Sequence, residues 1–506
     1  MRRGIGALLG AAASGAVTAL AFPKAGLMFP AWLGLIPLLF LLSDKSPGRA
    51  LGLGWTAGTA FYAVLLYWIP AVPAHYGNLP PAVSLLVYFF LALLLASSWG
   101  VFGLVFALLR RRLPAAAYWA APFIWVGQEY LVTHLLTGFP WGLLGLSQTK
   151  NISFLQMSAV TGVYGLSFVL VLFQSLFVAS VKFQNRLFFA VGTAFAVLVH
   201  AGGFLSLKTV PPTAESFPAA VIQGNVPSDV DWNDVGADFV LDLFDGYLDL
   251  TRRAADRGAR LVVWPEFTVP LCFSCREPLS RSLAGRLQEF VRETGTTLLV
   301  GTNEESGPAE SPRYHNTAVC LAPDLSTTRY AKMHLVPFGE YTPYKKIFGF
   351  INRVTHAIGE VTPGTETVLH AFEGIPFGSP ICYEVIFPDL VRRFTKKGAA
   401  FLVTITNDGW YGRSAAPHQH FAAAVVRAVE NRRFLLRAAT TGISGIIDPY
   451  GRVLVLSEIG TRTFLEAAVT PLRGLTFYAR HGDVFAHLGL TIVAVLLILS
   501  FFKRRP

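Results

Sequence analysis

The sequence predicts a polytopic bundle of membrane-spanning helices joined to one large polar domain of the α/β class. Of the 506 residues, 53% are hydrophobic and only 14% are charged, and the mean hydropathy is +0.48. This composition is too apolar for an ordinary soluble enzyme. Residues 212–480 differ from the rest, because they hold most of the acidic residues and contain no apolar run long enough to cross a bilayer. We therefore expect an N-terminal transmembrane domain (1–211), a polar domain (212–480) and a C-terminal transmembrane helix with a basic tail (481–506).

Eight apolar runs, each of about 20 residues, are long enough to cross a bilayer as helices. They lie at 4–22, 26–43, 51–72, 83–109, 115–136, 157–181, 187–207 and 483–502. The second run is the shortest. The sequence thus predicts seven spans before the polar domain and one after it.

The basic residues predict which side of the membrane the polar domain faces. With a cytoplasmic N-terminus, the inner segments carry Arg2, Arg3, Lys45, Arg49, Arg110, Arg111, Arg112, Lys182, Arg186, Lys503, Arg504 and Arg505. The short outer loops carry only Lys24 and Lys150. This asymmetry follows the positive-inside rule and predicts that both termini are cytoplasmic and that residues 212–480 are extracytoplasmic. The net charge of +11 is therefore mainly a topology signal, and no nucleic-acid partner is expected.

Within the polar domain, short β-rich runs alternate with amphipathic helical stretches. The expected strands are Ala219–Gln223, Leu261–Trp264, Thr297–Gly301, His315–Leu321, Gly378–Cys382 and Phe401–Thr406. Helical periodicity is clearest at 235–257, 279–294, 387–397 and 417–437. This alternation predicts a layered α/β domain that buries its sheets under helices.

Three residues with complementary chemistry stand beside the β-rich runs: Glu266, Lys332 and Cys382. A thiolate attacks acyl carbons readily, but a free thiol has a pKa near ~8.5 and needs a base or a nearby cation. Glu266 supplies a base and Lys332 a cation, which together with the backbone N–H of Tyr383 stabilises an oxyanion. The set indicates acyl transfer through a thioester. Each residue by itself is more often a solvated charge or a small core residue.

The sequences around these three residues resemble the Glu-Lys-Cys triad of the nitrilase (carbon-nitrogen hydrolase) superfamily. The more specific resemblance is to the apolipoprotein N-acyltransferases, the membrane members of that superfamily, and it covers essentially the whole chain. The matching motifs are Gln223-Gly224-Asn225-Val226-Pro227, Trp264-Pro265-Glu266, Leu335-Val336-Pro337-Phe338-Gly339-Glu340-Tyr341 after Lys332, Ile381-Cys382-Tyr383-Glu384 and Thr406-Asn407-Asp408-Gly409-Trp410.

The resemblance implies a protein of the bacterial inner membrane whose catalytic domain is a nitrilase-like αββα sandwich in the periplasm. It also implies that the enzyme needs no cofactor or metal. The cysteine would take an acyl chain from a phospholipid, usually phosphatidylethanolamine. It would pass the chain to the α-amino group of the diacylglyceryl-cysteine of an apolipoprotein, the last step of lipoprotein maturation. By position in the motifs, Glu340 and Glu384 resemble supporting carboxylates, and Tyr383 and Trp232 resemble substrate-contacting aromatics. Gly138-Phe139-Pro140-Trp141, which ends in Trp141, resembles the family's membrane-facing motif.

Two other functions are compatible with parts of the sequence. A membrane-tethered amidase or nitrile hydrolase would use the same triad on water, but a soluble substrate would not need seven preceding spans. A transporter with an outer binding module is disfavoured by the sparse charge within the spans.

Two further motifs, a cysteine pair and a histidine pair, have the spacing of metal ligands but are not interpreted as a metal site. Cys272 and Cys275 have the spacing of a redox or metal pair, and a disulfide or two free thiols are both favoured over a single-pair zinc site. His418 and His420 open an expected helix and are interpreted as cap or surface residues.

Overall fold

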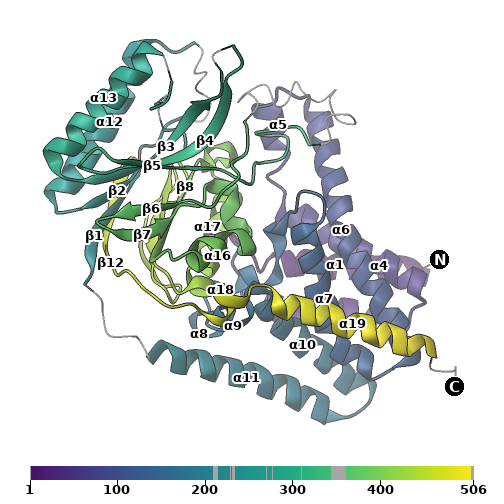
Figure 1. The fold of residues 1–506 in the computed structure, drawn as a ribbon. Helices are drawn as coiled ribbons and strands as arrows, with labels where there is room; N and C mark the ends of the chain where they lie inside the picture. Colours follow the sequence, from purple (N-terminus) through teal and green to yellow (C-terminus); the bar gives the residue numbers. More distant parts are fainter. Residues whose placement is uncertain are drawn as a thin grey trace. The chain divides into compact units, whose positions relative to one another are not determined.

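The computed structural model describes residues 2–208, 215–227, 230, 234–268, 271–275, 277–308, 310–343 and 361–502 (Figure 1). The chain forms two compact units. The first consists of Met1–Ala71, Pro80–Val210 and Arg480–Pro506, and the second of Val72–Leu79 and Pro211–Ala479. The short segment Val72–Leu79, from within the N-terminal half, thus belongs to the second unit. The assignment of these parts to membrane and extracytoplasmic domains stays a prediction.

The first unit is helical. Its long helices are α1 (Arg2–Ala19), α4 (Pro47–Leu65), α6 (Pro81–Arg112), α7 (Ala116–His134), α10 (Val163–Lys182), α11 (Arg186–Lys208) and α19 (Val484–Phe502). Short helices are α2 (Pro30–Leu33), α3 (Ile36–Leu42), α8 (Ile152–Leu155) and α9 (Ser158–Thr161). Across the described ranges, α6, α10, α11 and α19 are long and apolar enough to cross a membrane. The apolar run 26–43 is divided between α2 and α3, and the count of eight spans stays a prediction.

Small residues allow α1, α4 and α6 to pack closely. A Cβ added to Gly15 would lie 1.9 Å from the carbonyl oxygen of Ala57, and one added to Gly54 would lie 2.2 Å from that of Trp99. Close backbone approach of this kind is typical of helix packing in membranes. Large apolar side chains such as Leu86 and Phe90 of α6 are 72% and 66% exposed, which suits a lipid environment.

The second unit contains two six-stranded sheets. The first has the order β12-β1-β2-β3-β4-β5 and the second β11-β10-β9-β8-β7-β6. The strands of the first sheet are β1 (Phe217–Gln223), β2 (Leu261–Val263), β3 (Thr297–Ser306), β4 (Arg313–Leu321), β5 (Thr327–Ala331) and β12 (Thr463–Val469). Those of the second are β6 (Leu369–Phe372), β7 (Ile375–Gly378), β8 (Phe401–Thr406), β9 (Leu435–Ala439), β10 (Gly445–Ile447) and β11 (Val453–Leu456).

Helices cover the outer faces of the two sheets (Figure 1). On the first sheet, α12 (Ala237–Asp256) and α13 (Pro278–Thr294) bury residues such as Phe244 and Leu287 in one apolar core with strand residues such as Val262. On the second, α16 (Pro388–Lys396) and α17 (Ala416–Asn431) contact the strands. The sheets meet through aromatic residues, since the ring of Phe217 lies 4.4 Å from that of Phe372 and 5.4 Å from that of Phe401. The second unit is therefore a helix-sheet-sheet-helix sandwich.

Two expected elements end earlier than the sequence predicts. The expected strand Gly378–Cys382 is wrong beyond its first residue, because β7 (Ile375–Gly378) ends at Gly378 and Cys382 begins the 3₁₀ helix η4 (Cys382–Ile386). The expected helix 417–437 ends at Asn431, because Arg432 adopts a left-handed conformation with φ of 49°. The chain then enters β9. A left-handed residue commonly ends a helix in this way.

Candidate active site

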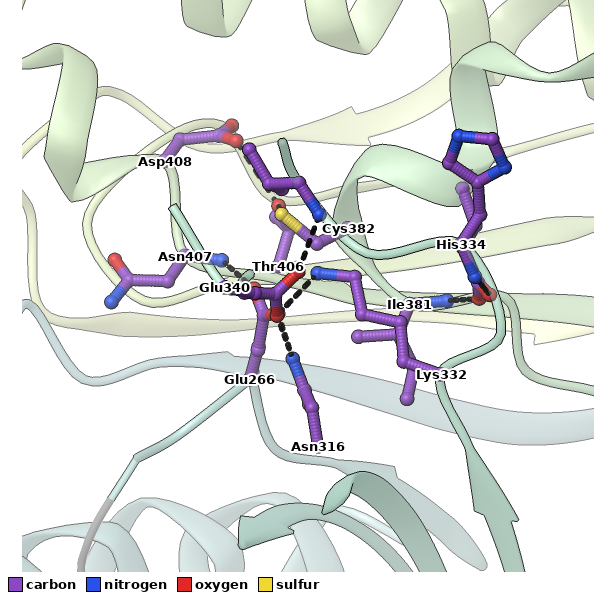
Figure 2. A network of polar contacts seen from close by, with 12 residues as sticks. Glu266, Asn316, Lys332, His334, Glu340, Ile381, Cys382, Thr406, Asn407 and Asp408 are labelled. Atoms are coloured by element: carbon purple, nitrogen blue, oxygen red, sulfur yellow. Dashed lines mark hydrogen bonds and ion pairs between the residues drawn. The ribbon is translucent and has the colours of Figure 1, made fainter. Parts of the chain in front are cut away.

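Glu266, Lys332 and Cys382 come from three separate segments and from both sheets. Glu266 follows β2 and Lys332 follows β5 of the first sheet, whereas Cys382 opens η4 after β7 of the second. Their exposed fractions are 3%, 1% and 7%. The sandwich therefore brings the three side chains to one buried place between the sheets (Figure 2).

Lys332 lies between two carboxylates. Its Nζ donates to Glu340 Oε1 at 2.9 Å and to Glu266 Oε1 at 3.2 Å. Asn316, on β4, joins the same two carboxylates, because its Nδ2 donates to Glu266 Oε1 at 2.7 Å and to Glu340 Oε1 at 2.8 Å. Figure 2 shows these side chains grouped around the lysine ammonium. The cluster holds Glu266 and Lys332 in fixed orientation.

The charge of Lys332 is maintained by this cluster. Burial by itself would lower the pKa of the lysine, but Glu266 and Glu340 outweigh burial and raise its pKa well above the usual value. Lys332 is therefore an ammonium at neutral pH, able to donate to an oxyanion.

Glu266 is also held from the second sheet. The backbone N–H of Asn407, directly after β8, donates to Glu266 Oε2 at 2.8 Å. One oxygen of Glu266 thus faces Lys332 and Asn316, and the other faces the backbone of the second sheet.

Cys382 combines a left-handed backbone with a buried thiol. Its φ is 50°, a conformation that non-glycine residues adopt rarely and that clusters at functional sites. Thr406 Oγ1 lies 3.2 Å from Cys382 Sγ. Burial raises the pKa of the Cys382 thiol, Glu266 raises it further and Lys332 opposes the increase. The resting thiol is therefore protonated, and its attack on an acyl carbon requires a base.

Glu384 ties the segment after β5 to the segment before the thiol. Its Oε1 accepts from Tyr330 Oη, the Met333 N–H and the His334 N–H at 2.8, 2.7 and 3.0 Å. Its Oε2 accepts from the N–H of Ile381 at 2.7 Å. Burial outweighs these hydrogen bonds and raises the pKa of Glu384 to about 7.

A second polar cluster lies on the other side of Cys382 and was not expected from the sequence. His420 is 1% exposed, so its interpretation as a cap or surface residue is wrong. Its Nε2 lies 3.0 Å from the carbonyl oxygen of Cys382, and its Nδ1 lies 2.8 Å from Asp408 Oδ1. Arg437 Nη2 donates to Asp408 Oδ2 at 2.7 Å. Although burial alone would raise it, Arg437 and His420 hold the pKa of Asp408 well below its usual range.

The remaining residues named from the sequence have different surroundings. Tyr383 is buried, with its ring 5.2 Å from that of Phe387. Trp141 belongs to the first unit, where it is buried and its ring lies 5.2 Å from that of Trp68. Trp232 lies outside the described residues.

The cysteines differ in their state. Cys272 and Cys275 form a disulfide, which decides between the two alternatives left open by the sequence. Cys320 and Cys382 are free. In the described part of the chain, no group of three or more His, Cys, Asp or Glu residues could hold a metal ion.

Comparison with known proteins first defines the class. Residues 219–473 match the Carbon-nitrogen hydrolase family, so the second unit is a nitrilase-like domain. Residues 14–176 match the Apolipoprotein N-acyltransferase N-terminal domain. An amidase from Nesterenkonia sp. has a similar structure, with a TM-score of 0.39, 20% identity, and coverage of 55% of this chain and 99% of that chain.

Proteins that are similar to this chain over nearly its whole length then define the family. The chain is 37% identical to the apolipoprotein N-acyltransferase of Geobacter metallireducens, covering 97% of this chain and 94% of that protein. It is 32% identical to that of Methylococcus capsulatus, covering 99% and 96%. The chain belongs to the apolipoprotein N-acyltransferase family and is an acyltransferase, which confirms the resemblance noted in the sequence.

Proposed function

We propose that this acyltransferase moves a fatty acyl chain from a phospholipid, with phosphatidylethanolamine as the donor, through a thioester on Cys382. The acceptor is the α-amino group of the diacylglyceryl-cysteine of an apolipoprotein. The observation that carries this proposal is the buried placement of Lys332 between Glu266 and Glu340, with the free thiol of Cys382 beside them (Figure 2).

In the first half-reaction, Cys382 Sγ attacks the ester carbonyl carbon of the donor while Glu266 accepts the thiol proton. Lys332 and the Tyr383 N–H stabilise the negative charge that develops on the carbonyl oxygen. The ester C–O bond then breaks, the leaving glycerol oxygen takes the proton from Glu266, and the acyl group stays on sulfur.

In the second half-reaction, the amine of the acceptor attacks the thioester carbon and gives a proton to Glu266. The C–S bond breaks and the proton returns to the thiolate of Cys382. The product is an amide, and no cofactor or metal takes part in either step.

Supporting roles follow from position. Glu340 holds Lys332 and Asn316, and Glu384 holds the backbone before the thiol. Tyr383, Trp232 and Trp141 are proposed as aromatic contacts of the lipid substrates.

We further propose that the chain crosses the bacterial inner membrane eight times, with both termini in the cytoplasm and residues 212–480 in the periplasm. The distribution of basic residues supports this topology. Alkaline phosphatase fused near residue 300 should be active, and the same enzyme fused after Arg112 should be inactive. The reverse pattern would refute the topology.

Mass spectrometry of the purified enzyme in phosphatidylethanolamine vesicles tests the proposed reaction. An acyl chain should appear on the peptide that contains Cys382 and not on the peptide that contains Cys320, the matched free thiol. Adding a diacylglyceryl-cysteine peptide should remove the chain and yield an N-acylated peptide. Release of free fatty acid without an acylated peptide would instead indicate a hydrolase.

A further inference from the structure

The end of strand β8 contacts the reaction centre with three consecutive residues. Thr406 reaches the thiol of Cys382 through its hydroxyl, Asn407 donates its N–H to Glu266, and Asp408 pairs with Arg437. Each residue therefore contacts a different part of the site. Asn407 holds Glu266 and the Asp408 carboxylate is paired with Arg437, but neither contact explains why the Thr406 hydroxyl lies beside the thiol.

The hydroxyl of Thr406 has one proton and two nearby acceptors. Its Oγ1 lies 3.1 Å from Asp408 Oδ1 and 3.2 Å from Cys382 Sγ. One hydroxyl proton satisfies only one acceptor at a time, and a hydroxyl rotates readily about its C–O bond. The structure thus places Thr406 between two alternative hydrogen bonds of similar length.

The charge on sulfur decides which hydrogen bond is stronger. While Cys382 is a neutral thiol, the carboxylate of Asp408 is the better acceptor, because hydrogen bonds to ionised groups are the stronger ones. Once Glu266 has taken the thiol proton, the sulfur is an anion in a buried site and needs a donor. Asp408 does not depend on Thr406 for its position, because Arg437 donates to its other oxygen.

We propose that Thr406 is a further catalytic residue, whose hydroxyl turns from Asp408 to the sulfur of Cys382 whenever that sulfur becomes negatively charged. The thiolate is present both when the thioester forms and when the acceptor amine expels the sulfur. Thr406 therefore assists both half-reactions without changing its own protonation state. This inference rests on the proposed role of Cys382 as the nucleophile.

The chain offers a matched pair of positions for the test. Thr404 lies two residues before Thr406 on β8, so its side chain points to the same face of the sheet. Both threonines are fully buried, but Thr404 Oγ1 has no hydrogen-bond partner among the described residues. Substitution by valine keeps the shape of threonine and removes the hydroxyl. Thr406→Val removes the proposed donor, whereas Thr404→Val removes a hydroxyl that forms no hydrogen bond with the residues that the structure describes.

The experiment measures how fast iodoacetamide alkylates Cys382 at different pH values, with each cysteine followed by peptide mass spectrometry. Thr406→Val should move the pH midpoint of alkylation upward by about one unit and slow thioester formation at pH 7 at least about tenfold, the scale of a hydrogen bond to a charged group. Thr406→Ser should restore both quantities. Thr404→Val should match the unsubstituted enzyme.

Cys320 reports whether each variant is folded, because this second free thiol is buried in β4. Its alkylation in Thr406→Val would reveal unfolding, and Thr406→Ala would then take the place of that variant. A folded Thr406→Val enzyme with an unchanged alkylation profile would overturn the inference. Alkylation needs no acyl donor, so failure of the proposed function would appear separately, as absence of the acyl chain from Cys382 in the unsubstituted enzyme.

Discussion

Glu340 and Glu384 are two buried carboxylates beside the same reaction centre, yet they bind different kinds of partner. Glu340 accepts hydrogen bonds from the Lys332 ammonium, the Asn316 amide and the backbone N–H of Val336. Among the residues that the structure describes, the donors to Glu384 are neutral: three backbone N–H groups and the Tyr330 hydroxyl. We therefore propose that Glu340 contributes to the charge of the site, whereas Glu384 fixes the position of its backbone.

The comparison of Glu340 with Glu384 indicates that the partners of a buried carboxylate, rather than its burial, determine its role. A carboxylate opposite a cation forms an ion pair with it and contributes to the electrostatic field at the reacting atoms. A carboxylate that receives only N–H and O–H donors acts as a crosslink between segments. Substitutions should separate the two roles, because one should change the rate of acyl transfer and the other the stability of the fold.

The largest effect on acyl transfer is expected from substitution of Cys382, which lies beside the segments that both carboxylates hold. Cys382→Ala should abolish the acyl-enzyme, because it removes the nucleophile that lies beside Glu266 and Lys332. The variant should remain folded, since alanine fits within the space of cysteine. Mass spectrometry after incubation with phospholipid measures the outcome. An acyl chain on the Cys382→Ala protein in thioester linkage would disprove the assignment.

Substitution of Lys332 should have the second largest effect on acyl transfer. Lys332→Met should slow thioester formation roughly 10²-fold or more, the scale observed when an oxyanion donor is lost. Lys332→Arg should restore only part of the rate, because a planar guanidinium does not reproduce the contacts of a compact ammonium. Single-turnover acylation assays compare the three proteins. A near-normal rate for Lys332→Met would exclude the proposed role of the ammonium.

Glu340→Gln should have a smaller effect on rate. The amide keeps the size of the side chain but removes one of the two negative charges beside Lys332. Glu266 would then be the sole carboxylate paired with the ammonium and less available as a base, so acylation should fall about tenfold, on the order of one charge-assisted hydrogen bond. The same assay should show little change for Glu384→Gln. Equal rates for the two variants would remove the distinction between the two carboxylates.

Glu384→Gln should instead change how stability depends on pH. The pKa of Glu384 is about 7 in the folded protein against an ordinary 4.5, so the folded state holds the proton more tightly than the unfolded state. Stability should therefore fall as the pH rises from about 4.5 to about 7, by about 3 kcal/mol at most. Glu384→Gln removes this dependence. Thermal unfolding between pH 5 and pH 8 compares the two proteins, and parallel pH profiles would contradict the expectation.

Much of the fold and the identity of the central residues could be predicted from the sequence. Local patterns predict the apolar runs, the strand at Phe401–Thr406 and the positions of Glu266 and Lys332 directly after strands. The strand expected at Gly378–Cys382 overlaps β7 only at Gly378, and the left-handed backbone at Cys382 opens a 3₁₀ helix instead. Hydrophobic pattern does not encode such a turn at a non-glycine residue.

The polar contacts of the site could not be predicted for a different reason. Asn316 joins Glu266 and Glu340 from β4, and Asn407 reaches Glu266 from the opposite sheet. These contacts depend on which strands become neighbours, and single-sequence periodicity does not give that information. His420 was misjudged in the same way, because α17 looks amphipathic in sequence although nearly all its residues are buried. The only signal for Asp408 was its place in a motif shared with the family.

The pairing of β1 with β12 has a consequence for biogenesis. These two strands are the first and the last of the domain to be synthesised, and they pair along their whole length from Phe217 opposite Val469 to Gln223 opposite Thr463. Until β12 has been synthesised, one edge of β1 has no neighbouring strand and can pair with other chains. Such long-range pairing is also slow to form. The first sheet is therefore complete only when almost the entire domain has been synthesised, and a nascent chain stalled before Thr463 carries all three central side chains in a sheet with an unpaired edge.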